Sequence, residues 1–251
     1  MAFLDYMKKL GVPAKSLVGR GTENRGRKKA PLGVIIHTPG ITFIRKQRDA
    51  LGDKCTSKRL QEACAVAFDE RPYQPNIIIG YDKVYLLEDT DHRPMHAGSL
   101  KGSVYARDWR QWAKPLGGKG WELHKRDGHV VYDWWDKVYS ERANPTKVFP
   151  WGANPNDAVG IDLLPDPSTN TFSDWQLSVL EMVVASLARL HEFPIDKFHV
   201  VSHSYASPCE RGTVKRRGEI VGVHWDPKNF DFDHVAVAGI DVDKLVCEED
   251  V

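Results

Sequence analysis

The chain has almost no net charge, few cysteines and no apolar run long enough for a membrane-spanning helix. Its 251 residues hold 35 Lys and Arg against 34 Asp and Glu, so bulk electrostatics do not favour a nucleic-acid partner. The segment Met1 to Tyr6 lacks a leading basic region and carries Asp5 among its apolar residues, which does not fit a secretory signal peptide. We therefore expect no membrane span, no nucleic acid, and synthesis in the cytoplasm without a signal peptide.

The four cysteines show no CxxC pair, so a structural zinc knuckle is not expected and we predict reduced thiols. With 41% hydrophobic and 27% charged residues, the composition is typical of a globular domain with a core. Charge is unevenly distributed, however. Residues 1–30 hold eight Lys/Arg and two Asp/Glu, whereas residues 231–251 hold one Lys and seven Asp/Glu. We interpret residues 1–30 as a basic N-terminal arm that includes a short helix from Phe3 to Leu10, and residues 236–251 as an acidic C-terminal tail.

The apolar pattern between these ends predicts an α/β domain over residues 31–235, with a central mixed β-sheet flanked by helices. Ser173 and Gln176 form a capping-box pattern at the start of the strongest helix, and Pro194 follows its end. Residues between the first strand and the first helix look like a basic loop. The expected strands are 33–37, the hairpin 77–79 with 84–87, 158–164 and 198–202, and the expected helices are 57–68 and 173–190.

Residues 100–150 form an insertion that is rich in aromatic side chains. Five of the eight tryptophans lie there, with charged residues between them: Trp109, Trp112, Trp121, Trp134 and Trp135. Aromatic faces pair with sugar rings, which would suit a glycan-binding flap. We favour the alternative, that most of these rings pack the insertion onto the core, because a segment of this size needs its own apolar anchor.

Two of the expected strands end in histidine, at His37 and at His203, and Asp226 comes before a proline in a later loop. Neutral imidazole nitrogens and one carboxylate are good ligands for zinc. Three protein ligands with one open position are typical of a catalytic zinc site, whereas structural sites use four.

The order of these motifs resembles the zinc-dependent N-acetylmuramoyl-L-alanine amidases of the type that includes phage lysozyme-amidases and peptidoglycan recognition proteins. That family has a VIIHxT-like strand, a GHSD-like strand end, and a KxDPG-FDW or KxCPG-FD motif. The resemblance covers about residues 31 to 233, with Phe230, Asp231 and Phe232 standing for the aromatic-acidic end. It implies zinc bound by His37, His203 and Asp226.

The resemblance also implies two catalytic roles. Asp162 interrupts the apolar run 158–164 at the position of the glutamate in an IGIEL-type motif, which acts on the zinc-bound water. A lone carboxylate in such a run is costly unless it is paired or faces a cleft, which favours a functional role. His224 stands two residues before Asp226, where relatives carry a lysine, and would stabilise the oxyanion.

Two further residues are candidates for contact with substrate. His96 lies in Met95-His96-Ala97-Gly98, which matches an HAG motif whose histidine lines the substrate cleft in relatives. A histidine that forms a structural hydrogen bond in a loop is an equally good interpretation. Tyr73 lies close to, but offset from, the position of a tyrosine that relatives use before the central hairpin.

These features together predict hydrolysis of the amide between N-acetylmuramic acid and L-alanine in peptidoglycan or a muropeptide. Without a signal peptide, such an enzyme would reach the cell wall by phage release, as an endolysin, or by a secretion system, as an effector. Two alternatives stay open: a binding module that recognises peptidoglycan without cutting it, and a cytosolic amidase that recycles wall fragments. Retention of Asp226 beside both histidines favours catalysis over binding alone.

Overall fold

The computed structural model describes residues 2–18, 30–71, 74–92, 96, 157–196 and 199–203. Within these residues the helices are α1 (Ala2–Lys9), α2 (Ile41–Leu51), α3 (Ser57–Asp69) and α7 (Asp174–His191), with a 3-10 turn at Gly52–Lys54. The strands are β1 (Ala14–Ser16), β2 (Val34–His37), β3 (Ile77–Ile79), β4 (Val84–Leu86), β5 (Val159–Leu163) and β6 (Val200–Ser202).

The strands form one mixed sheet, in the order β1-β4-β3-β5-β2-β6. The β3–β4 pair is the antiparallel hairpin that the sequence predicts, and the other neighbouring strands run parallel. The predicted α/β domain with a central mixed sheet is therefore confirmed at the level of architecture. Because β3, β5, β2 and β6 are mutually parallel, their carboxyl ends meet along the same edge of the sheet.

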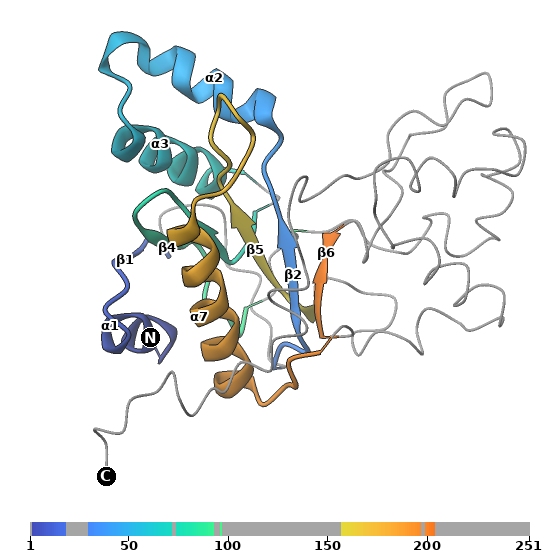
Figure 1. Ribbon diagram of the computed structural model, residues 1–251. Helices are drawn as coiled ribbons and strands as arrows, with labels where there is room; N and C mark the ends of the chain where they lie inside the picture. The colour runs from blue at the N-terminus through green and yellow to red at the C-terminus, as the bar shows by residue number, and fades with distance from the viewer. Residues whose placement is uncertain are drawn as a thin grey trace, which may run out of the picture.

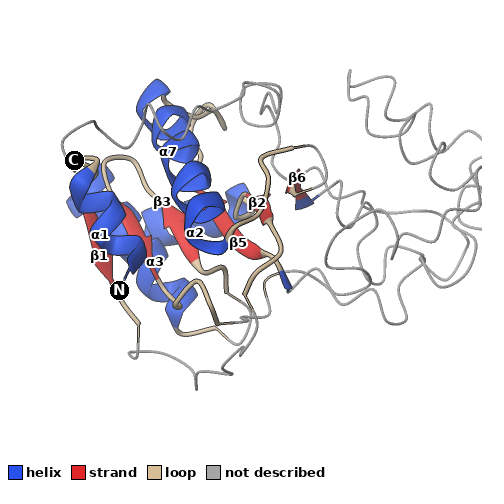
Figure 2. Cartoon of the chain, turned by 90° about the horizontal axis from the view of Figure 1, so that it is seen from below, coloured by secondary structure: helices blue, strands red, loops and turns tan. Residues whose placement is uncertain are grey.

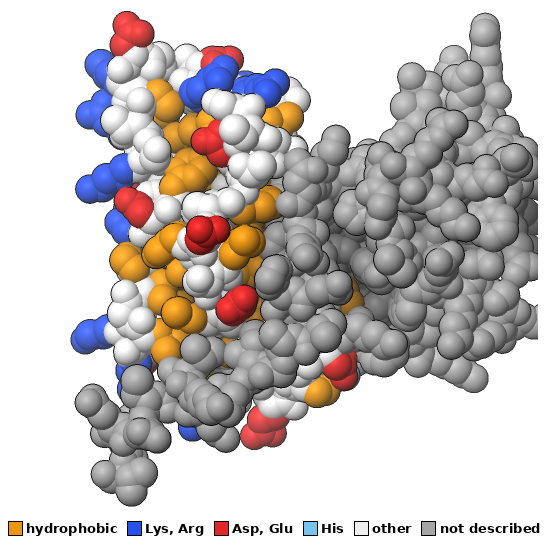
Figure 3. Space-filling model, in the orientation of Figure 1, with side chains coloured by type: hydrophobic (Ala, Val, Ile, Leu, Met, Phe, Trp, Pro, Cys, Tyr) orange, Lys and Arg blue, Asp and Glu red, His pale blue; other side chains and the backbone are white. Residues whose placement is uncertain are grey.

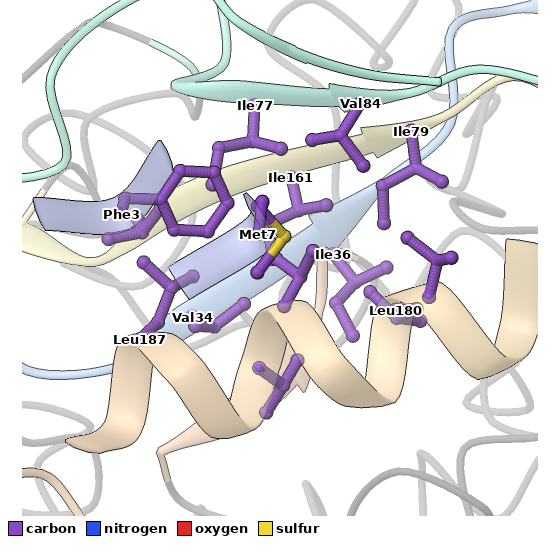
Figure 4. Close-up of a cluster of buried hydrophobic side chains, with 14 of the residues drawn as sticks. Phe3, Met7, Val34, Ile36, Ile77, Ile79, Val84, Ile161, Leu180 and Leu187 are labelled. Atoms are coloured by element: carbon purple, nitrogen blue, oxygen red, sulfur yellow. The ribbon is translucent and has the colours of Figure 1, made fainter. Parts of the chain in front are cut away.

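Successive residues of each strand point to opposite faces of the sheet, and helices cover both faces. Helices α7 and α1 lie on one face, whereas α3 lies on the other beside α2 (Figures 1 and 2). Figure 4 shows the first of these layers, in which α1 and α7 side chains meet alternate strand residues: Phe3, Met7, Leu180, Leu187, Val34, Ile36, Ile77 and Ile161. On the second face, Ile78 and Tyr85 pack against Leu60, Cys64 and Phe68 of α3.

The two predicted helices are confirmed, and local caps explain where they begin. Ser173 accepts a hydrogen bond from the Gln176 backbone N–H, and the Gln176 side chain accepts from the Ser173 backbone N–H, which completes the capping box. The Gln176 amide also donates to the Leu164 carbonyl at 2.8 Å, so the cap ties α7 to the end of β5. Thr56 caps α3 through the Arg59 backbone N–H.

Two interpretations of the sequence need correction. Residues 2–18, which we placed in a basic arm, are part of the domain instead. The short helix expected there is α1, whose Phe3 and Met7 are buried in the core, and β1 pairs with β4. Lys15 of β1 forms an ion pair with Glu62 of α3, which lowers the pKa of that carboxyl. The expected basic loop after β2 contains the helix α2, in which Ile44 is fully buried and most other residues are polar. With so few apolar residues, its helical period is hard to see in the sequence.

Lys and Arg side chains gather over α2 on the face that Figure 3 shows. Arg45 and Lys46 of this helix are exposed. No helix in the described part of the chain is long and apolar enough to cross a membrane. Cys55 and Cys64 are free thiols, as predicted, and burial raises the pKa of Cys64 to about 12. The insertion 100–150, the tail 236–251, Cys209 and Cys247 lie outside the described residues.

Candidate functional site

Three of the predicted site residues meet at the carboxyl edge of the sheet. His37 is the last residue of β2, and its register partner on the adjacent strand β5 is Asp162. His203 directly follows β6, which pairs with β2 on the other side. The three side chains therefore come from neighbouring parallel strands in the order β5, β2, β6. They are 4% exposed at His37, 6% at Asp162 and 8% at His203.

Strand alternation places all three on the same face. Val34 and Ile36 belong to the α7-side core, so Ile35 and His37 point to the α2–α3 side. The same count along β5 places Ile161 with α7 and Asp162 with α2 and α3. In β6, Val200 belongs to the α7-side core, and His203 has the opposite parity. A one-residue shift in any of these strands would turn its polar group into the apolar core.

The His37 ring lies between two other imidazoles. Its centroid is 4.4 Å from that of His203, with an interplanar angle of 47°. Its centroid is 5.1 Å from that of His96, and the two rings are nearly perpendicular at 89°. The His37 Nε2 and His96 Nδ1 atoms are 2.9 Å apart, which is a hydrogen-bond distance. The other nitrogen of His96, Nε2, lies 2.9 Å from the carbonyl oxygen of Ala158.

Gly160 and Asn76 shape the position that His96 occupies. A Cβ atom on Gly160 would lie 2.5 Å from Cγ of His96, so a larger residue there would displace the ring. Asn76 hydrogen-bonds both sides of the Gly160 peptide: its backbone N–H donates to the Gly160 carbonyl, and its Oδ1 accepts from the Gly160 N–H. The Asn76 amide nitrogen also donates to the carbonyls of Asp89 and His92, in the segment that precedes His96.

These residues open into a pocket of about 210 Å³. His37, His96, Asp162 and His203 line it. Phe43, Phe68 and Arg71 also line it, with the two ring centroids 4.7 Å apart and the Arg71 guanidinium carbon 4.2 Å from the Phe43 centroid. The pocket therefore combines hydrogen-bonding and metal-ligating atoms with two aromatic rings and a cation.

Imidazole nitrogens suit zinc, and His37 and His203 present two of them from adjacent strand ends. In the described part of the chain, neither His96 nor Asp162 has a ligand atom that completes a group of three with His37 and His203 within 4.8 Å of one another. The predicted third ligand, Asp226, lies outside it. A different group, Asp89, Asp91 and His92, does have ligand atoms within 4.8 Å of one another. That group is partly exposed, and His92 Nδ1 lies 2.6 Å from Glu88 Oε1.

The structure thus brings together His37, His96, Asp162 and His203 from the predicted set. The others, Tyr73, His224 and Asp226, lie outside the described residues. Sequence reasoning missed Gly160, Asn76 and Arg71. Gly160 had a detectable signal, because glycine inside an apolar strand often marks a place where another group approaches closely. Asn76 and Arg71 had none, since their roles depend on contacts between distant segments.

Comparisons with known proteins do not assign a function to this site. No family model, curated protein or solved structure matches the chain. The resemblance to zinc amidases therefore rests on the motifs in the sequence. The case for a function rests on those motifs together with the arrangement of His37, Asp162 and His203 around one pocket.

Proposed function

We propose that this protein is a zinc-dependent amidase that hydrolyses the bond between N-acetylmuramic acid and L-alanine in peptidoglycan. The observation that carries the proposal is the convergence of His37, Asp162 and His203. They arrive from three adjacent parallel strands, share one face and line one pocket. In open α/β sheets, ligands usually bind at the carboxyl ends of the parallel strands, where these polar residues lie.

His37 and His203 would hold the metal ion, with Asp226 as the third protein ligand. Both imidazoles are buried, so a bound ion would be held where water screens its charge poorly. Zinc supplies the electrophile for such a reaction and makes a water molecule nucleophilic near neutral pH. The ligand set of two histidines and one carboxylate leaves an open coordination position, as catalytic zinc sites do.

Asp162 is the group that moves protons in this proposal. It lies beside His37 in the strand register, lines the pocket and is almost fully buried. A carboxylate there accepts a proton from the attacking water and then donates it to the nitrogen of the departing L-alanine amine. Amines leave poorly as anions, so this second transfer is as necessary as the first. His224 would donate a hydrogen bond to the oxygen that becomes negative in the transition state.

The proposal places the reaction in the cell wall, reached after release by a phage or delivery by a secretion system. The test is digestion of purified wall sacculi, with mass analysis of the products and metal content measured on the same protein sample. We expect stem peptides with a free L-alanine amino group, unmodified glycan strands and about one zinc per chain.

His203→Ala should lose zinc and activity together. The matched control is His199→Ala, four residues earlier, whose Nδ1 lies 2.7 Å from Asp196 Oδ1 and which does not line the pocket. Two results would contradict the proposal. New reducing sugar ends with peptides still attached to muramic acid would show a glycosidase. Sacculi that retain the protein without any product would show a binding module.

A further inference from the structure

We propose that His96 is a positioning residue for His37: it fixes the protonation pattern of the His37 ring so that Nδ1 carries the lone pair. The observation behind this is a chain of hydrogen-bonding atoms from Ala158 through His96 to His37. The inference rests on the proposed function for its purpose, because a metal ligand needs its lone pair on a defined nitrogen. Its geometry stands independently of the reaction.

The direction of each hydrogen bond follows from the first atom in the chain. The Ala158 carbonyl oxygen can only accept, so His96 Nε2, at 2.9 Å, must carry a hydrogen and donate. A neutral imidazole has one N–H, which leaves His96 Nδ1 as an acceptor. His37 Nε2 lies 2.9 Å from that atom and must therefore donate to it. The hydrogen of neutral His37 is then on Nε2, and the lone pair is on Nδ1.

The surrounding residues hold His96 where this chain can form. Gly160 provides room for the ring, because a Cβ at that position would lie 2.5 Å from His96 Cγ and 2.7 Å from its Nδ1. Asn76 fixes the Gly160 peptide through two hydrogen bonds and also holds the carbonyls of Asp89 and His92. One buried asparagine thus links the strand beneath His96 to the segment that leads into it.

Histidines that bind metal usually donate their second ring N–H to a carboxylate, a backbone carbonyl or water, and this partner orients the ring. In this protein the partner would be another histidine, which is itself oriented by its hydrogen bond to the backbone carbonyl of Ala158, the residue before β5. The interpretation of His96 as a histidine with a structural hydrogen bond is thereby favoured over direct contact with substrate.

The first test reads the ring nitrogens directly, in metal-free protein at pH 8, above the ordinary pKa of histidine. Two-bond proton–nitrogen correlation spectra of histidine-labelled protein distinguish the two tautomers, and the His37→Gln spectrum identifies the signals of His37. We expect His37 and His96 both to carry hydrogen on Nε2 alone. In His96→Ala, the His37 signals should shift toward a mixture of tautomers. A wild-type His37 with hydrogen on Nδ1 would overturn the proposal.

The second test measures zinc affinity without reference to any reaction. His96→Ala should weaken zinc binding by roughly 10- to 100-fold, the usual effect of losing the partner of a metal ligand. Gly160→Ala should act in the same direction, because it displaces the ring. His96→Asn should keep most of the affinity, since its amide oxygen can accept from His37 near the position of Nδ1. Equal zinc affinity in His96→Ala and the wild type would contradict the positioning role.

His199→Ala is the matched control, because it removes a histidine that does not line the pocket and whose Nδ1 lies 2.7 Å from Asp196 Oδ1. It should leave both the His37 tautomer and zinc affinity unchanged. The tests also separate this inference from the proposed function. If the protein binds zinc but releases no peptide from sacculi, the amidase proposal fails and the role of His96 stands. If the enzyme is active but His37 is a mixture of tautomers, the role of His96 fails and the amidase proposal stands.

Discussion

The two faces of the sheet use the same strands for different purposes. On the face under α7 and α1, the residues of β2 and β5 are apolar along the whole strand: Val34, Ile36, Val159, Ile161 and Leu163. On the face toward α2 and α3, the same two strands carry polar side chains near their carboxyl ends. The last inward position is His37 in β2 and Asp162 in β5.

This difference shows how the fold reconciles stability with buried polar groups. Burying a charge or an imidazole costs free energy unless the group is paired or opens into a polar cavity. On the α7 side, β2 and β5 contribute apolar residues, which pack against α7 and α1 without burying a polar group of their own. On the α2–α3 side, Phe43 and Phe68 line the same pocket as His37, Asp162 and His203.

The largest expected effect is on activity, from Asp162→Asn. The amide is nearly the same size as the carboxylate but cannot accept the proton, so turnover should fall on the order of 10²–10⁴. Zinc content and the midpoint of thermal unfolding should change little. Turnover on a soluble muropeptide, zinc content and unfolding are measured on one preparation. If Asp162→Asn keeps full turnover, the proton-transfer role is wrong.

The second prediction concerns Ile161, the neighbour of Asp162 on the same strand but on the opposite face. Ile161→Ala removes buried methyl groups from the α7-side core and should cost about 2–5 kcal/mol of unfolding free energy. Catalysis per folded molecule should be retained. Val66→Ala is the control, because Val66 is 41% exposed and its truncation should stay within about 0.5 kcal/mol. A large loss of turnover without a loss of stability would contradict the assignment of Ile161 to a purely structural face.

Much of this arrangement could be predicted from the sequence, because it depends on local patterns. Continuous apolar runs indicate buried parallel strands, and β2, β3 and β5 follow that rule. The histidines at the ends of two such runs, and the aspartate within a third, predict from the sequence alone a site at one edge of the sheet. The capping box at Ser173 likewise marked the start of α7 correctly.

The remainder depended on contacts that no local pattern encodes. The role of α1 in the core follows from its packing against α7, although its first turn is followed by basic residues that suggest a solvated arm. Helix α2 buries Ile44 and leaves most of its surface polar. The hydrogen bond between His96 and His37 joins residues 59 positions apart, so no local pattern in the sequence indicates it.

The third prediction tests how far the α7 face depends on the local cap. Ser173→Ala removes the side-chain acceptor for the Gln176 N–H and should cost about 1 kcal/mol of unfolding free energy. Ser57→Ala, at an exposed position in the first turn of α3, is the matched control and should have a smaller effect. Equal losses in the two variants, measured by denaturant unfolding, would show that the cap at Ser173 has no special role.

The smallest expected effect concerns Asp166, which lies in the same segment as Asp162. Asp166 is exposed, whereas Asp162 is buried. The backbone N–H of Thr169 hydrogen-bonds to Asp166 Oδ1, as does that of Ser168, and these bonds hold the pKa of Asp166 below its usual value of 3.8. A carboxyl whose pKa is lowered by folding stabilises the protein above its unfolded pKa, and this contribution is lost as the pH falls through the folded pKa. Solvent screening at an exposed site limits the effect to less than about 1 kcal/mol.

We therefore expect Asp166→Ala to destabilise the protein slightly at pH 7 and less at pH 2.5, as measured by denaturant unfolding at both values. A difference that grows in acid would mean that Asp166 stabilises its turn as a neutral group, which would contradict the role of the backbone N–H bonds.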